Sequence, residues 1–179
     1  MHQYIYFLSI IICLYGFNNQ QVINTSVPLG IISIGTTQSP LVMYGAKIFK
    51  DKKCQRCHKL DEDGKKRLKS LDGLGGKYPD IWLYSFLQDP ETYIPKTRMP
   101  SFESLFKKEI DKNRLDKILL QSSQNISAEQ LDLAWEKLQL EVNEIKYNLQ
   151  KDLSPNTEIL SSEGLALMAY LQKIPSSKK

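Results

Sequence analysis

Apolar residues in the body of the chain recur mainly at helical spacing. Leu41, Tyr44 and Ile48 follow one another at steps of three and four, which places them on one face of a helix. Residues 165–171 (LALMAYL) combine strong helix formers and stop short of Pro175. The pattern therefore predicts one helix near the start of the body and another near its end.

A further periodic segment follows Ser127, which forms a capping-box pattern with Gln130. We expect a long helix here, because six apolar residues alternate steps of four and three. Two interpretations of this stripe stay open: it packs on its own domain, or it docks onto a partner protein. The first is favoured, since two to three heptads are roughly too few for a coiled coil. The stripe consists of Leu131, Trp135, Leu138, Val142, Ile145 and Leu149.

The N-terminal part of the chain has a different pattern. Residues 1–46 contain no Asp, Glu, Lys or Arg, and residues 4–17 form an apolar block. A block of this length is typical of a signal-peptide core and short for a bilayer crossing. We predict a signal peptide or membrane anchor over residues 1–20, a linker over 21–40 and a folded domain over 41–179. The leader indicates an extracytoplasmic location on the periplasmic side, with the domain either secreted across the inner membrane or anchored to it.

Composition and charge add to this picture. With 41% apolar and 25% charged residues, the chain has ordinary globular composition. Residues 40–70 hold ten Lys and Arg against four Asp and Glu, a local charge of +6, whereas residues 71–179 hold 14 against 16, or −2. The basic segment is either solvated surface or a rim that steers an acidic redox partner. Nucleic acid is not an expected partner, because the leader directs the chain out of the cytoplasm.

Cys54, Cys57 and His58 form a C-x-x-C-H motif within the basic segment. This spacing lets two thiols attach to one haem while the following imidazole reaches the iron. A zinc site would need more ligands, and the remaining Cys13 and His2 both lie in the leader. A thioredoxin-like redox pair is disfavoured, because the flanks show no βαβ alternation. The motif therefore indicates one covalent haem c with an iron ligand from the histidine.

A second axial ligand is expected from one of the methionines. Met99 lies between Pro95 and Pro100 in an irregular segment, where two prolines stiffen a loop that can present a thioether to iron. Met43 and Met168 fall on apolar helix faces, so we expect them in the core. Met99 is therefore the predicted second metal ligand.

The segment between the motif and this loop supplies candidate walls for the cofactor. Residues 72–79 form a glycine-rich connector, and glycines permit close backbone approach to a flat group. The helix predicted over residues 81–87 carries Trp82, Tyr84 and Phe86. These three side chains either line a haem pocket or belong to the ordinary core.

In combination, these residues resemble a class I c-type cytochrome. The resemblance rests on Gly45 and Phe49 in the first helix, the C-x-x-C-H motif, the Met99-Pro100 pair and Tyr170 in the last helix. It implies an all-α fold around one covalent haem. It also implies that the first and last helices cross at Gly45, Phe49 and Tyr170.

Within that family, the chain is most similar to the mono-haem subunit of cbb-type cytochrome c oxidases. This similarity implies redox protein partners, among them haem-copper oxidase subunits. The residues over about 103–155 exceed what a minimal carrier needs, so we expect a helical insertion before the last helix. The segments that carry the similarity are residues 75–82, 88–90, 94–95, 98–102, 157–158 and 165–172.

The expected function is electron transfer through one haem with His/Met ligation. The chain would act as a membrane-tethered or periplasmic carrier or as a non-catalytic subunit of a respiratory oxidase. An alternative is a haem enzyme of peroxidase type, which requires a labile sixth ligand. The proline-framed Met99 argues against that alternative.

Overall fold

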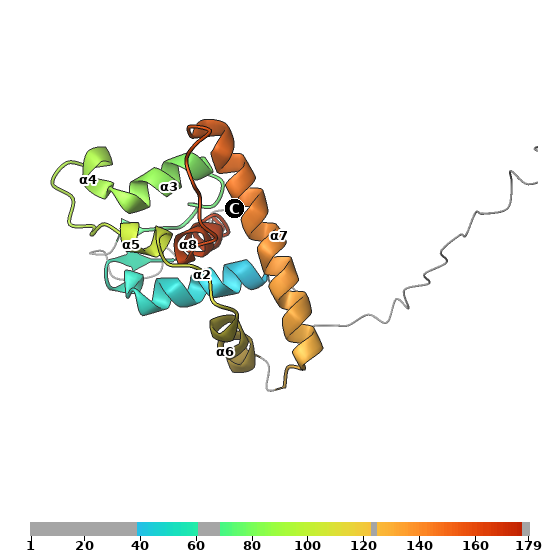
Figure 1. The fold of residues 1–179 in the computed structure, drawn as a ribbon. Coiled ribbons are helices and arrows are strands. Elements are labelled where there is room, and N and C mark those ends of the chain that lie inside the picture. The colour runs from blue at the N-terminus through green and yellow to red at the C-terminus, as the bar shows by residue number, and fades with distance from the viewer. Residues whose placement is uncertain (1–38, 61–68, 123–124, 177–179) are drawn as a thin grey trace, which may run out of the picture. The chain divides into compact units, whose positions relative to one another are not determined.

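The computed structural model describes residues 39–60, 69–122 and 125–176. In these ranges the chain is predominantly helical around one apolar core (Figure 1), which confirms the helical class predicted from the sequence. None of the described helices is both long enough and apolar enough to cross a bilayer. The predicted leader lies outside the described residues. The elements are α2 (Pro40–Asp51), the 3-10 helix η1 (Cys54–Arg56), β1 (His58–Lys59), β2 (Lys69–Ser70), α3 (Asp80–Gln88), α4 (Pro90–Tyr93), α5 (Glu103–Phe106), α6 (Lys112–Ser122), α7 (Ala128–Asp152) and α8 (Glu163–Leu171).

Helix α2 begins with a strong local start signal. Pro40 occupies the first turn, and the Ser39 Oγ accepts a hydrogen bond from the Val42 N–H at 3.1 Å. The helix ends at the lysine-rich turn, as its sequence predicts. Its predicted apolar face is buried at Leu41, Tyr44, Ile48 and Phe49.

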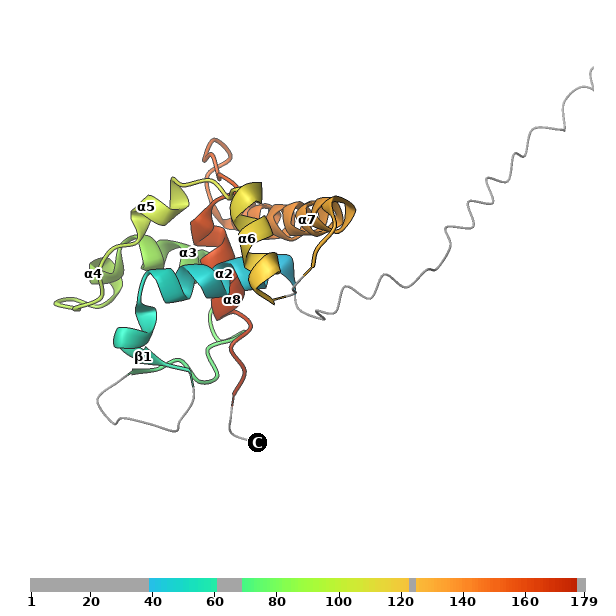
Figure 2. The same cartoon turned by 90° about the horizontal axis from the view of Figure 1, so that it is seen from below.

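Helices α2 and α8 cross in direct backbone contact (Figure 2). A Cβ atom on Gly45 would lie 1.9 Å from the carbonyl oxygen of Ala166 and 2.8 Å from the Cβ of Tyr170, so this approach requires glycine. About one turn later along α2, the rings of Phe49 and Tyr170 pack with centroids 5.3 Å apart. The crossing predicted at these residues is confirmed.

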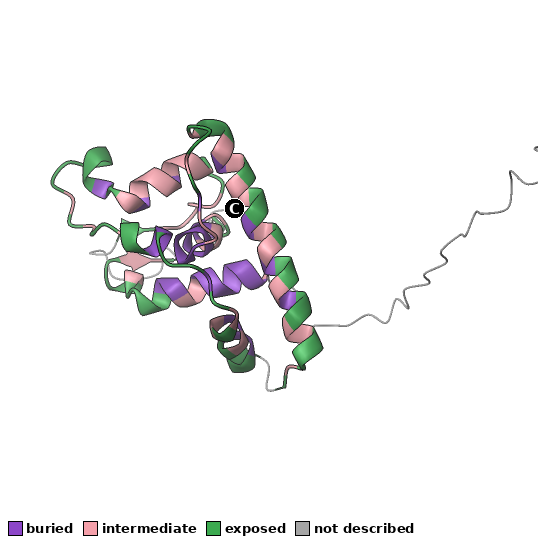
Figure 3. Ribbon diagram, viewed as in Figure 1, coloured by how far each residue is buried: buried purple, intermediate pink, exposed green. Residues whose placement is uncertain are grey.

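Buried residues concentrate on α2 and α8, as the ribbon coloured by burial in Figure 3 shows. Met43 and Met168 belong to this core, as their positions on apolar helix faces predict. Helix α5 closes one side of α8, where a Cβ on Gly164 would come within 2.6 Å of the Phe106 ring. A second close contact with α8 thus also requires glycine, because a side chain at this position would overlap the Phe106 ring.

The predicted insertion, about residues 103–155, contains α5, the short helix α6 and the long helix α7. The capping box is present: Ser127 Oγ accepts from the Gln130 N–H, and Gln130 Oε1 accepts from the Ser127 N–H at 2.8 Å. Along the predicted stripe, Leu138, Val142 and Leu149 are each 0% exposed and join the common core. The interpretation that the stripe packs on its own domain is therefore confirmed.

Helix α7 also binds the start of α2. The Glu141 carboxylate accepts hydrogen bonds from the Ser39 hydroxyl at 2.6 Å and from the Leu41 N–H at 3.2 Å. A carboxylate at a helix N-terminus satisfies otherwise free N–H groups and opposes the positive end of the helix dipole. The insertion thus supplies a cap, from 100 residues away, to the first helix of the domain.

The structure adds a small element that helical periodicity does not predict. Strands β1 and β2 pair in parallel, with His58 opposite Lys69. The Lys69 N–H donates to the Cys57 carbonyl at 3.0 Å, and the Leu71 N–H donates to the Lys59 carbonyl at 2.8 Å. This pair fixes the chain directly after the C-x-x-C-H motif.

Substitution of Gly45 tests the α2–α8 contact. We expect Gly45→Ala to lower the free energy of unfolding by about 2 kcal/mol, because the added methyl overlaps backbone and outweighs the better helix propensity of alanine. The control is Gly76→Ala. Here φ is +71°, and an added Cβ would meet no atom of another residue within 4 Å beyond its chain neighbours, so only about 1 kcal/mol of backbone strain is expected. Urea unfolding followed by circular dichroism measures both. A neutral or stabilising Gly45→Ala would contradict the contact.

Candidate functional site

The C-x-x-C-H motif begins directly after α2. Lys53 adopts a left-handed conformation with φ of 57°, which turns the chain out of the helix. In η1 the Arg56 N–H donates to the Lys53 carbonyl at 2.9 Å, and the Cys57 N–H donates to the Cys54 carbonyl at 3.1 Å. Cys54, Cys57 and His58 are therefore brought together on one tight turn, as the motif predicts.

Burial sets the protonation of the motif. Desolvation raises the pKa of the half-buried Cys54 thiol, and the adjacent Cys57 adds to the shift. Desolvation also lowers the pKa of His58, so its imidazole is neutral at neutral pH. The His58 Nδ1 is buried and has no hydrogen-bond partner among the described residues. The raised thiol pKa argues against a reactive thiolate pair, whose thiol pKa values are lowered.

The glycine connector ties the motif to the end of α8. A Cβ on Gly75 would lie 2.6 Å from the carbonyl oxygens of Gln172 and Ile174, and the Gly73 N–H donates to the Pro175 carbonyl at 2.9 Å. We expected these glycines to admit a flat cofactor. At Gly75 and Gly73, the close approach is instead to the backbone and Ser176 that follow α8.

The Gln172 side chain completes this junction. Its Oε1 accepts from the Gly76 N–H at 2.9 Å, while its Nε2 donates to the Tyr78 carbonyl at 2.8 Å and to the Asp80 carboxylate at 2.9 Å. One amide thus joins the end of α8, the glycine connector and the start of α3.

Met99 lies in a separate loop whose base is closed by hydrogen bonds. The Ser101 hydroxyl donates to the Gln88 carbonyl at 2.6 Å, and the Phe102 N–H donates to the Leu87 carbonyl at 2.8 Å. Within the loop, the Met99 N–H donates to the Thr97 Oγ1 at 3.2 Å. The Met99 side chain is half-buried against the core. That it faces His58 stays a prediction.

An aromatic stack runs along one face of α3. The rings of Tyr78 and Trp82 are stacked with centroids 4.1 Å apart, and those of Trp82 and Phe86 follow at 4.6 Å. Tyr93, from α4, meets the Trp82 ring edge-on at 5.7 Å. Trp82 and Phe86 therefore share a surface, which is compatible with a wall for a flat cofactor.

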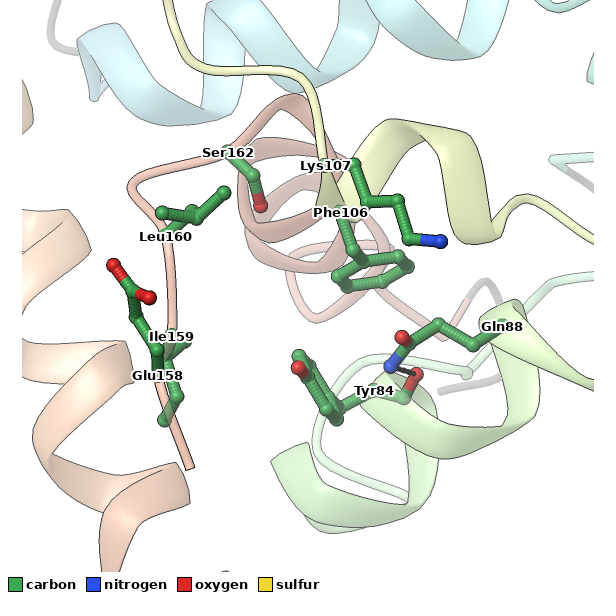
Figure 4. Close-up of a pocket in the computed structure, with 8 residues that line it drawn as sticks. All are labelled: Tyr84, Gln88, Phe106, Lys107, Glu158, Ile159, Leu160 and Ser162. Carbon is green, nitrogen blue, oxygen red and sulfur yellow. Dashed lines mark hydrogen bonds between the residues drawn. The ribbon is translucent and has the colours of Figure 1, made fainter. Parts of the chain in front are cut away.

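Tyr84 belongs to the other face of α3. It meets the Phe106 ring edge-on at 5.0 Å and lines a pocket of about 220 Å³ between α3, α5 and the segment before α8 (Figure 4). Tyr84 thus does not share the aromatic surface of Trp82 and Phe86. The pocket is lined by Tyr84, Gln88, Phe106, Lys107, Glu158, Ile159, Leu160 and Ser162.

An ionic network lies beside the motif and was not predictable from local sequence. Glu163, the first residue of α8, is 1% exposed, and its carboxylate lies 2.6 Å from Arg114 and 3.0 Å from Lys108. Arg114 also reaches the Asp51 carboxylate at 2.6 Å. The hydrogen bond from Lys47 is the largest effect and lowers the pKa of Asp51; burial opposes it, and the charges of Lys47 and Arg114 add to the lowering.

This network links the insertion to the end of α2. Asp51 is the last residue of α2, three positions before Cys54. The Arg114 guanidinium also lies over the Tyr44 ring at 5.5 Å, and the Tyr44 hydroxyl accepts from the Asp111 N–H at 3.2 Å. Helix α6 therefore stabilises the helix that presents the candidate haem thiols.

The class of protein that these features indicate is a mono-haem c-type cytochrome. Comparison with known families agrees, because residues 64–177 match the family described as cytochrome c oxidase, mono-heme subunit/FixO. The match covers more than half of the chain, and the chain belongs to this family. The predicted similarity to the mono-haem subunit of cbb-type oxidases is thereby confirmed. No curated protein matches the chain.

The family match and the motif are separate observations. The matched residues begin at position 64, after His58, and include Met99 and α8. Membership implies one haem and an electron-transfer role within an oxidase. The haem-attachment motif adds to this the residues that would hold the haem.

Replacement of Arg114 tests the ionic network. We expect Arg114→Met to lower the free energy of unfolding by about 2 kcal/mol or more, because it leaves the buried Glu163 carboxylate poorly compensated. The matched control, Lys108→Met, removes a partner of the same carboxylate whose side chain is 61% exposed, and about 0–1 kcal/mol is expected. Equal losses in urea unfolding would mean that Arg114 has no special role.

Proposed function

We propose that this chain transfers electrons through one haem attached covalently to Cys54 and Cys57, with His58 and Met99 as iron ligands. The observation that carries the proposal is the C-x-x-C-H turn at the end of α2, in a domain whose remainder matches a mono-haem family. When bound, the haem supplies one-electron oxidation and reduction of its iron.

The motif residues suit this role individually. The neutral imidazole of His58 is the form that binds a metal, and its Nδ1 has hydrogen-bonding capacity that no described residue satisfies. Cys57 is exposed and Cys54 is half-buried against the core, so one thiol faces solvent and the other lies at the edge of the core. Both thiols are free and therefore available for thioether bonds.

Met99 is the best-placed methionine for the sixth position. Met43 and Met168 are enclosed in the core by α2 and α8, whereas Met99 lies in a loop closed at its base by two hydrogen bonds. A firmly held thioether favours reversible electron transfer and a raised reduction potential. A peroxidase-type enzyme, the alternative, would require this position to open.

The proposed setting is the extracytoplasmic face of the membrane, where the chain serves as a subunit of a haem-copper oxidase. The N-terminal segment would act as an anchor or a cleaved signal. Lys50, Lys52 and Lys53 are exposed beside the motif and form no ion pair with another described residue. This positive charge suits an acidic redox partner.

Absorption spectra test the axial ligand. We expect Met99→Leu to remove the sulfur-to-iron charge-transfer band of the oxidised protein, because leucine keeps the volume but offers no thioether. Met43→Leu makes the same exchange in the core and should keep the band. Persistence of the band in Met99→Leu would rule out this ligand and reopen the peroxidase alternative.

Covalent attachment is tested by mass spectrometry of the denatured protein. Cys57→Ser should lose one of the two thioether bonds, with secondary structure retained, because Cys57 is exposed. Cys13→Ser makes the same change in the leader and should leave attachment unaltered. Haem attached by two thioethers in Cys57→Ser would contradict the assignment.

A further inference from the structure

Helix α7 carries a second apolar line that faces away from its own domain. Leu133, Leu140 and Tyr147 are 40%, 70% and 67% exposed, and the last two are the most exposed large apolar side chains in the described part of the chain. We call these three residues the outer stripe. The exposed outer side of α7 is visible in Figure 3.

The outer stripe is regular. Its members are spaced by seven residues, which at about 1.5 Å per residue gives a line of roughly 21 Å. Leu140 follows the buried Leu138 by two positions, about 200° around the helix, so the stripe lies opposite the buried face. A helix that is apolar on two opposite sides is typical of one packed between two bodies. Seven-residue spacing suits a partner helix.

Acidic residues flank most of the stripe. Glu129, Glu136 and Glu144 are exposed, and none of them forms an ion pair with another described residue. Lys137 is a cation beside them, and Lys151 lies over the Tyr147 ring at 4.2 Å at the C-terminal end. Over its first two thirds, the face is thus apolar with acidic edges, which is complementary to a basic, apolar-striped partner.

We infer that the outer stripe of α7 docks the chain permanently onto a basic amphipathic helix of another oxidase subunit. This inference rests on the proposed function, since an oxidase subunit must have a stable protein interface. Among the other exposed large apolar residues, Leu60 lies two positions after His58, and Tyr93 and Ile94 come shortly before the Met99 loop. Electron exchange requires that surface to remain accessible. The outer stripe is apart from the motif and is free for permanent contact.

Copurification with the other oxidase subunits from the same organism tests the inference. The full chain with its haem is coexpressed with them, in wild-type form and as Leu140→Glu. We expect Leu140→Glu to reduce the recovered oxidase by about tenfold or more, because it places a charge at the centre of an apolar contact. The matched control is Leu120→Glu on α6, which changes a leucine that is 45% exposed outside the stripe and should have no effect.

A second variant tests the charge. Glu136→Lys with Glu144→Lys should also reduce the recovered oxidase, and the loss should shrink as salt rises. Haem content and spectra should be unchanged in all variants.

The possible outcomes distinguish a failure of the proposed function from a failure of the docking inference. If the wild-type chain binds no oxidase subunit, the proposed role as an oxidase subunit fails and this inference fails with it. If the wild type copurifies with the oxidase but Leu140→Glu does so equally, or if Leu120→Glu loses the oxidase equally, only the inference fails. It also fails if sedimentation shows a wild-type dimer that Leu140→Glu converts to a monomer, because the stripe then binds a second copy.

Discussion

The backbone contact between α2 and α8 is the constraint on which the rest of the structure depends. At Gly45 the two helices approach so closely that a single methyl group cannot be added without displacing the backbone. Since α2 ends three residues before Cys54, the position of α8 determines where the motif begins. The end of α8 then holds the glycine connector through Gln172 and Ile174. The segments before and after the motif are thus both positioned by contacts with α8 and the residues that follow it.

The insertion contributes to this arrangement by holding α2 at both ends. Glu141 caps its first turn, and Arg114 pairs with Asp51 in its last. Glu141 and Arg114 are partly buried, whereas Asp51 is exposed, so each end of α2 is held by specific polar contacts in addition to apolar packing. A segment that looks additional in length is therefore part of the support of the candidate haem site.

Local patterns predicted what depends on neighbours in sequence. The spacing of Leu41, Tyr44 and Ile48 located α2, and Ser127 with Gln130 located the start of α7, because periodicity and capping act within one or two turns. The C-x-x-C-H motif is local in the same sense.

Contacts between distant segments were not accessible in this way. The cap from Glu141 joins residues 100 positions apart in the chain, and the Arg114–Glu163 pair joins residues 49 apart. No periodicity marks such partners in a single sequence. The glycine connector shows a related limit: Gly75 signalled a close approach, but the approaching group is the chain's own backbone.

The dependence of the motif on α8 also bears on the order of events during folding. Cys54 precedes α8 by more than a hundred residues, so the unfolded chain presents both thiols before α8 has packed on α2 and before the core against which Cys54 lies has formed. Burial raises the pKa of that thiol and reduces its reactivity once the domain has closed. If the haem is attached as proposed, attachment would meet the least hindrance in the unfolded chain, before the crossing of α8 over α2 closes the domain.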